Sequence, residues 1–235
     1  MKRELVLAAV IVTTILAITL VPACKEAAPI ASNLSASEII ADSAETMREI
    51  DSFHFEITHE GGGTPIAMGL EMREAEGDVA KPGKLSTTIS ATMNGIPVRV
   101  DIITVGTTTY MTNPLTGQWE LLPGEFSAIS IFDPDAGVVS ILEGMTDLTR
   151  LDDEKIGTFT CIHIKGEIPC ESLRPITLTS VEGVDIDVEV WIDGEEFLLH
   201  QIKLDGRITE TEKEGIIRYL KLSDFDQEVE IELPE

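Results

Sequence analysis

The alternation of apolar and hydroxyl side chains between Leu85 and Met93 constrains the fold of this chain more than any other feature of its sequence. Successive side chains of a β-strand point to opposite faces of a sheet, so this segment has one apolar face and one hydroxyl-rich face. Asn94-Gly95 follows directly, and this dipeptide strongly favours a two-residue type I′ turn. The sequence therefore predicts a hairpin that returns through residues 96–105.

Similar alternation, interrupted by glycine, proline and aspartate, predicts further strands along the chain. They are expected at residues 52–58, 66–75, 107–112, 118–120, 155–165, 184–192, 197–204, 215–225 and 228–233. A helix is expected from Ser35 to about Asp51, because Ser35 and Glu38 have the spacing of a capping box and apolar residues follow at helical intervals. One or two short helices are expected between residues 126 and 145.

These elements predict an α+β domain with one large, curved antiparallel sheet. A sheet that is apolar on one face needs a cover for that face, and a few short helices with 5% aromatic residues supply little material for it. Either the sheet closes on itself, or it curls around the helices as a half-barrel and leaves an apolar cavity for apolar ligands. Twelve residues are candidates to line this cavity, although each is expected primarily to be part of the hydrophobic core. They are Ile40, Ala44, Met47, Phe55, Ile89, Met93, Val98, Val100, Val138, Ile141, Leu142 and Val188.

The N-terminus has the layout of a secretory signal. Lys2 and Arg3 precede a stretch without charge from Leu5 to Val21, and Pro22-Ala23-Cys24 follows. The last residues of this segment resemble a lipobox, in which the cysteine is lipidated and becomes the mature N-terminus. We expect a signal peptide at residues 1–23, a tether at residues 24–34 and one domain at residues 35–235, held outside the cytoplasm at a membrane. An uncleaved membrane anchor is the alternative.

The net charge and the cysteine content restrict the expected partners and the expected state of the cysteines. The formal net charge is −25, from 17 basic and 42 acidic residues, and such a surface repels nucleic acid. Apart from Cys24, the chain has only Cys161 and Cys170. Two remaining cysteines in an oxidising compartment favour one disulfide between them, and two free buried thiols are the alternative.

No pattern in the sequence indicates an enzyme, a metal site or a cofactor site. The four histidines are scattered, and neither an HExxH pair nor a G-x-S-x-G turn is present. Asp185, Asp187 and Glu189 alternate along one expected strand, where side chains two residues apart are separated by about 7 Å. Carboxylates so spaced do not converge on a cation, and we interpret them as a solvated outer face.

The order of these segments resembles the LppX/LprAFG family of cell-envelope lipoproteins over residues 35–235. The resemblance is carried by the lipobox cysteine, the segment Ile50-Asp51-Ser52-Phe53-His54-Phe55, the Asn94-Gly95 turn, Thr109-Tyr110 before Trp119, Val190-Trp191-Ile192-Asp193 before Leu199-His200-Gln201, and Leu222-Ser223-Asp224-Phe225 near the end. It implies a half-barrel similar to the LolA-type lipoprotein carriers, with a large hydrophobic cavity and no catalytic residues. This chain is more acidic than that pattern and has the additional Cys161 and Cys170.

The resemblance further implies binding of acylated lipids or glycolipids and their transfer within the envelope. The expected partners are the lipid itself, the membrane through lipidated Cys24 and an envelope transporter, with no nucleic acid. A sensory or interaction domain of the same shape, whose apolar face is simply filled, is the alternative function.

Overall fold

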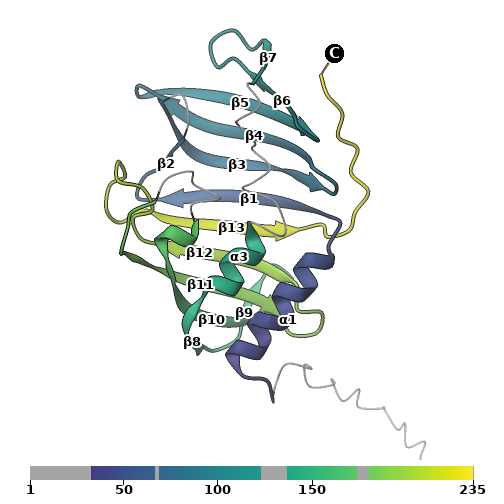
Figure 1. The fold of residues 1–235 in the computed structure, drawn as a ribbon, viewed down its shortest axis with the longest axis vertical. Coiled ribbons are helices and arrows are strands. Elements are labelled where there is room, and N and C mark those ends of the chain that lie inside the picture. The colour runs from purple at the N-terminus through teal and green to yellow at the C-terminus, as the bar shows by residue number, and fades with distance from the viewer. Residues whose placement is uncertain (1–32, 67–68, 123–136, 174–179, 235) are drawn as a thin grey trace, which may run out of the picture.

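The protein folds as a large, open antiparallel sheet with helices over part of one face (Figure 1). The structure is a computed structural model, and it describes residues 33–66, 69–122, 137–173 and 180–234. Within these ranges, thirteen strands form one sheet in the order β7-β6-β5-β4-β3-β1-β13-β12-β11-β10-β8, with β2 paired to β3 and β9 paired to β10. The expected α+β fold class is confirmed.

The elements have the following bounds. The first half of the sheet consists of β1 (Ser52–Glu60), β2 (Thr64–Pro65), β3 (Leu70–Ala80), β4 (Lys84–Met93), β5 (Ile96–Val105), β6 (Thr108–Thr112) and β7 (Trp119–Leu121). The second half consists of β8 (Thr146–Arg150), β9 (Glu154–Ile156), β10 (Phe159–Pro169), β11 (Asp185–Asp193), β12 (Leu199–Asp205) and β13 (Ile217–Ser223). The described helical elements are α1 (Ala36–Glu49), α3 (Val138–Gly144) and the short 3-10 helix η3 (Cys170–Leu173).

The hairpin of β4 and β5 forms as the sequence predicts. Met93 lies opposite Ile96, and the register continues without a shift to the pair of Lys84 and Val105. Asn94 and Gly95 have φ angles of 51° and 80°, the left-handed conformation that a type I′ turn requires at both central positions. Local turn chemistry therefore sets the register of this part of the sheet.

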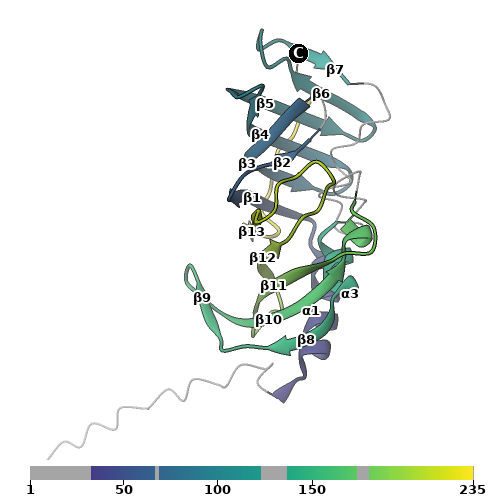
Figure 2. The same ribbon diagram turned by 90° about the vertical axis from the view of Figure 1, so that its left-hand side faces the viewer.

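Two meanders make up the sheet, and the pairing of β1 with β13 joins them. Phe55 of β1 lies opposite Leu222 of β13, although the two strands come from opposite ends of the described chain. The resulting sheet curves strongly but does not close, and β7 and β8 are the two ends of its strand order (Figure 2). This open, curved sheet is the half-barrel expected from the resemblance.

Both helices lie over the half of the concave face that β10 to β13 form (Figures 1 and 2). Helix α1 begins with the predicted capping box, in which Glu38 N donates to Ser35 Oγ at 3.3 Å and Ser35 N donates to Glu38 Oε2 at 2.8 Å. It contacts α3 and β8, and α3 in turn contacts β10 and η3. Neither α1 nor α3 is both long enough and apolar enough to cross a membrane, and the same holds for every other helix within the described ranges.

Several expected boundaries were wrong. Residues 228–233 alternate like a strand, but within residues 224–234 the structure has no strand. The single strand expected at residues 155–165 is divided into β9 and β10 by a turn at Gly157, whose φ is 59°. Strand β8 was not predicted, and of the helices expected between residues 126 and 145 only α3 lies among the described residues.

The expected disulfide between Cys161 and Cys170 is wrong, because both cysteines are free and buried. The strand expected to end at residue 165 continues instead as β10 to Pro169. Nine residues of extended chain span about 30 Å, and a disulfide needs Cα atoms about 4.4–6.8 Å apart. Cys161 therefore lies near one end of β10 and Cys170 just beyond the other, where its thiol donates to Ile208 O at 3.2 Å.

Candidate functional site

The concave face of the sheet carries one continuous cluster of apolar side chains. The cluster extends from Met111 on β6, across β5, β4, β3, β1, β13, β12 and β11, to Ile164 on β10. Alternation along each strand places these side chains on the same face as α1 and α3. All twelve candidate cavity-lining residues belong to this cluster or pack against it, but the structure divides them into two groups.

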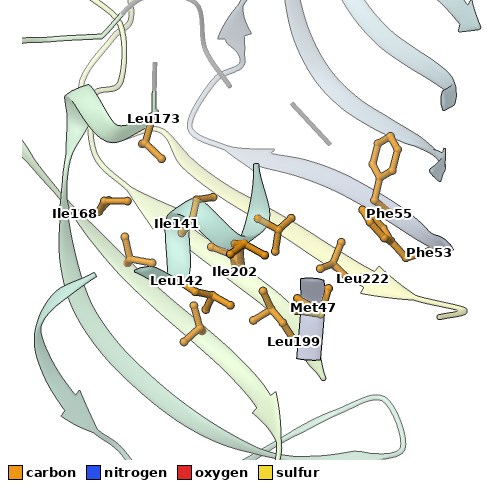
Figure 3. Close-up of a cluster of buried hydrophobic side chains, with 14 of the residues drawn as sticks. Met47, Phe53, Phe55, Ile141, Leu142, Ile168, Leu173, Leu199, Ile202 and Leu222 are labelled. Carbon is orange, nitrogen blue, oxygen red and sulfur yellow. The ribbon is translucent and has the colours of Figure 1, made fainter. Parts of the chain in front are cut away.

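The first group lies between the helices and the sheet and is buried. Every member is at most 5% exposed: Ile40, Ala44 and Met47 on α1, Val138, Ile141 and Leu142 on α3, and Val188 on β11. The close-up shows Ile141 and Leu142 of α3 near Ile202 of β12, and Met47 of α1 close to Leu199 and Leu222 (Figure 3). These seven residues are buried between the helices and the sheet.

The second group lies on the strands that α1 and α3 do not cover. Ile89, Met93 and Val98 on β4 and β5 are only partly buried, and Val100 between them is 1% exposed. Ile89 lies directly opposite Val100, so these side chains form one apolar strip across the hairpin. We refer to Ile89, Met93, Val98 and Val100 as the β4–β5 strip. Its partial exposure makes it the part of the concave face that is best placed to contact a ligand.

Phe55 lies at the junction of the two groups. It is fully buried on β1, opposite Leu222 on one side and Gly77 of β3 on the other. A Cβ atom at Gly77 would lie 2.1 Å from the carbonyl oxygen of Ser86, so only glycine fits at this position. The close approach of β3 to β4 behind Phe55 therefore depends on Gly77.

A buried polar cluster interrupts the apolar face at one end. Arg218 shares a strand face with Leu220 and Leu222 and forms an ion pair with Glu212. Its Nε donates to Thr64 Oγ1 at 2.7 Å, and its Nη1 donates to Gly206 O at 3.1 Å. Glu212 Oε2 accepts from Ile208 N at 2.8 Å and Thr209 N at 3.3 Å.

His59 completes this cluster, with Nε2 2.8 Å from Thr64 Oγ1 and Nδ1 2.8 Å from Arg73 O. Burial lowers the pKa of His59, and the nearby Arg218 guanidinium lowers it further. Sequence reasoning missed the cluster. The signal that was available is a single arginine in phase with the apolar residues of β13.

On the opposite, convex face, His163 lies in aromatic surroundings. His163 stacks on Trp191 at 4.3 Å between ring centroids, and its Nε2 lies 2.7 Å from Glu189 Oε2. Lys203 Nζ donates to the other oxygen of Glu189 at 2.9 Å and, together with His163, lowers the pKa of that carboxyl against the opposing effect of burial. Within the described ranges, no three His, Cys, Asp or Glu side chains are grouped to hold a metal ion.

Two expectations fall outside what the structure tests. Cys24, the expected lipidation site, lies outside the described residues. An apolar cavity between sheet and helices stays a prediction, and so does the assignment of any single residue to ligand contact.

Comparisons with known proteins point to one family. The family model described as LppX_LprAFG lipoprotein matches residues 35–231. The chain is 24% identical over 106 residues to a protein named lipoarabinomannan carrier protein LprG from Mycolicibacterium hassiacum, and this match covers 45% of the chain and 43% of that relative. The chain thus matches less than half the length of this curated relative.

Two solved structures share the fold. The structure of LprF from Mycobacterium bovis superimposes with a TM-score of 0.67 at 18% identity, over 85% of this chain and 96% of that one. The structure of lipoprotein LppX from Mycobacterium tuberculosis superimposes with a TM-score of 0.62 at 18% identity, over 84% of this chain and 98% of that one. At this level of identity the likeness concerns the fold.

Proposed function

The chain belongs to the LppX_LprAFG lipoprotein family, and from that premise we propose that it is a membrane-anchored carrier. It binds acylated lipids or glycolipids on the concave face of its half-barrel and carries them within the cell envelope. It performs no chemistry on them and is not an enzyme. The name of the relative LprG, a lipoarabinomannan carrier, supports a cargo with acyl chains.

The β4–β5 strip is the observation that carries this proposal. It continues the apolar face beyond the helices, and three of its four residues are only partly buried. An acyl chain on this strip would leave water at a gain of about 0.8 kcal/mol per buried CH₂ group. Several CH₂ groups suffice for binding without any polar contact, which suits a carrier that must also release its cargo.

Lipidation of Cys24 supplies the anchor in this proposal. Support comes from the lipobox-like residues 20–24 and from the description of the family as lipoproteins. Mass spectrometry of the mature N-terminus tests it: an acylated Cys24 at residue 1 of the mature protein is expected. An unmodified Cys24 within an intact leader would refute the lipid anchor.

Uptake of a fluorescent fatty acid by the purified protein tests the cargo proposal. We expect Val98→Asp to weaken uptake about tenfold, since a carboxylate on the strip disfavours the acyl chain by at least 1.4 kcal/mol. Thr92→Asp is the matched control, because Thr92 lies on the hydroxyl-rich face of the same hairpin. Equal uptake by both variants would place the binding elsewhere.

A non-carrier function is the rival, and the burial of the seven residues beneath α1 and α3 favours it. In a sensory or interaction domain, the concave face would need no ligand at all. Organic extraction and native mass spectrometry of the purified protein separate the two functions. A protein that contains no lipid and takes up no fatty acid would contradict the carrier proposal.

A further inference from the structure

The hairpin that joins β6 to β7 presents an apolar tip on a strongly acidic molecule. Residues 113–122 read Asn-Pro-Leu-Thr-Gly-Gln-Trp-Glu-Leu-Leu and contain one charged residue, in a chain with a net charge of −25. The side chains of Leu115, Leu121 and Trp119 are 78%, 62% and 36% exposed. We refer to residues 113–121 as the β6–β7 tip.

The one charge of the tip is engaged within the tip itself. Glu120 Oε1 accepts a hydrogen bond from Asn113 Nδ2 at 2.9 Å. The tip therefore has no cationic group to recruit an anionic partner, and its one carboxylate accepts a hydrogen bond within the tip. A neutral, apolar surface is the expected complement.

Every backbone N–H of the turn has an acceptor inside the turn. Asn113 N donates to Gln118 O and Gly117 N donates to Asn113 O, each at 2.8 Å. Asn113 Oδ1 accepts from Leu115 N at 2.9 Å and from Thr116 N at 3.2 Å, Gln118 N donates to Thr116 Oγ1 at 3.4 Å, and Pro114 has no N–H.

These internal hydrogen bonds bear on two kinds of partner. A segment that pairs with another protein through its backbone offers an extended edge, whereas the outer edge of β7 is only three residues long. A segment that enters a bilayer must satisfy its own backbone, since lipid chains offer no acceptors. The donors of the turn at residues 113–118 meet the second requirement, and tryptophan beside leucine is the side-chain combination that membrane interfaces favour.

We propose that the β6–β7 tip docks on a lipid bilayer, with Leu115, Trp119 and Leu121 inserted at its interfacial region. The tip lies at the opposite end of the molecule from the start of α1, where the N-terminal segment joins the domain (Figures 1 and 2). The surface that it meets is therefore a second bilayer. The inference goes beyond the proposed function and does not require the concave face to bind cargo.

Fluorescence quenching between two vesicle populations tests the proposal with the full chain. The protein is reconstituted in phosphatidylcholine vesicles, and acceptor vesicles of phosphatidylcholine with brominated acyl chains are added. Of the two tryptophans, Trp119 is at the tip, whereas Trp191 is 5% exposed and its Nε1 donates to Glu154 Oε2 at 3.0 Å. We expect the acceptor vesicles to quench Trp119 and to leave Trp191 unquenched.

Variants make this result specific. Trp119→Phe should abolish the quenching, and Leu115→Asp should raise the acceptor lipid concentration for half-maximal quenching about tenfold. Leu151→Asp is the matched control, because Leu151 is 37% exposed and follows β8 at the other end of the strand order. The fluorescence of this variant should be quenched to the same extent as that of the unchanged chain. Leu115→Asp should also take up fatty acid normally, which separates a failure of docking from a failure of cargo binding.

Three outcomes would overturn the proposal. The first is fluorescence that acceptor vesicles leave unchanged, and the second is quenching that persists in Trp119→Phe. The third is a blue shift of Trp119 emission that depends on protein concentration and not on lipid, which would assign the tip to contact with a second copy of the chain.

Discussion

At the scale of single residues, His200 shows how an aromatic environment ties stability to pH. Its ring stacks on Phe159 at 4.2 Å between centroids and meets the edge of Phe225 at 5.6 Å. Its Nε2 is buried without a hydrogen-bond partner in the described structure. Burial lowers the pKa of His200, and Asp193 offsets this only in part.

A lowered pKa in the folded state means that the unfolded chain binds the proton more tightly. The stability from a neutral His200 is therefore complete above the unfolded pKa of about 6.5 and is lost as the pH falls below it. We expect a lower urea midpoint at pH 5 than at pH 7.5, and a smaller difference in His200→Gln. Part of the pH dependence should persist in His200→Gln, because the pKa of His59 is also lowered. An identical pH dependence in His200→Gln would contradict this assignment.

The two cysteines give a second prediction at this scale. Burial, with a smaller contribution from Asp193, raises the pKa of Cys161 to about 11, and burial also raises the pKa of Cys170. Because the thiolate is the reactive form, both thiols should resist Ellman's reagent in the folded Cys24→Ser chain. Both should react once guanidinium chloride unfolds the chain without a reductant. Absence of reactive thiols after unfolding would indicate a disulfide.

At the scale of elements, the ion pair of Arg218 and Glu212 attaches the loop after β12 to the concave face. Both side chains are at most 8% exposed, so removal of one leaves the other charged and buried. We expect Glu212→Gln to lower the free energy of unfolding by about 3–5 kcal/mol. In Glu212→Leu combined with Arg218→Met, the loss should be smaller than in the single variant. Chemical denaturation measures both values, and additive losses would contradict a coupled pair.

How far the sequence predicts each element depends on where its determining contacts lie. β4 and β5 were predicted within a residue of their bounds, because Asn94-Gly95 and strict alternation are local signals. β8 was missed because it is an edge strand with mostly exposed residues and no alternation. Residues 228–233 alternate, but alternation alone does not supply a neighbouring strand, and the segment stays outside the sheet in the described structure.

The candidate site follows the same rule. Alternation placed Ile89, Val98 and Val100 on one face without difficulty. It could not show that α1 and α3 cover only the half of the face that contains Val188, because helix placement depends on contacts between distant segments. The ion pair of Glu212 could not be predicted from the sequence either, because Glu212 lies in a turn and its partner is on β13.

At the scale of the whole molecule, the two halves of the concave face should respond differently to cargo. The residues beneath α1 and α3 are buried, whereas three of the four residues of the β4–β5 strip are only partly buried. A bound acyl chain at 100 times its dissociation constant stabilises the fold by about 2.7 kcal/mol. Hydrogen exchange with mass spectrometry should show the added protection in β4 and β5 and little in α1. Equal protection in both halves would contradict local binding on the strip.

The pairing of β1 with β13 also governs when the protein can fold. Under the proposed export, with the N-terminus first, β1 would emerge early, but the strand opposite Phe55 would arrive only with Leu222. The two meanders can pair internally before that point, but they stay separate sheets until β13 joins them. Contacts between such distant segments slow folding, because loop closure precedes any gain from pairing. The topology thus delays completion of the sheet until β13 has emerged, which is compatible with the proposed export of the chain in an unfolded state.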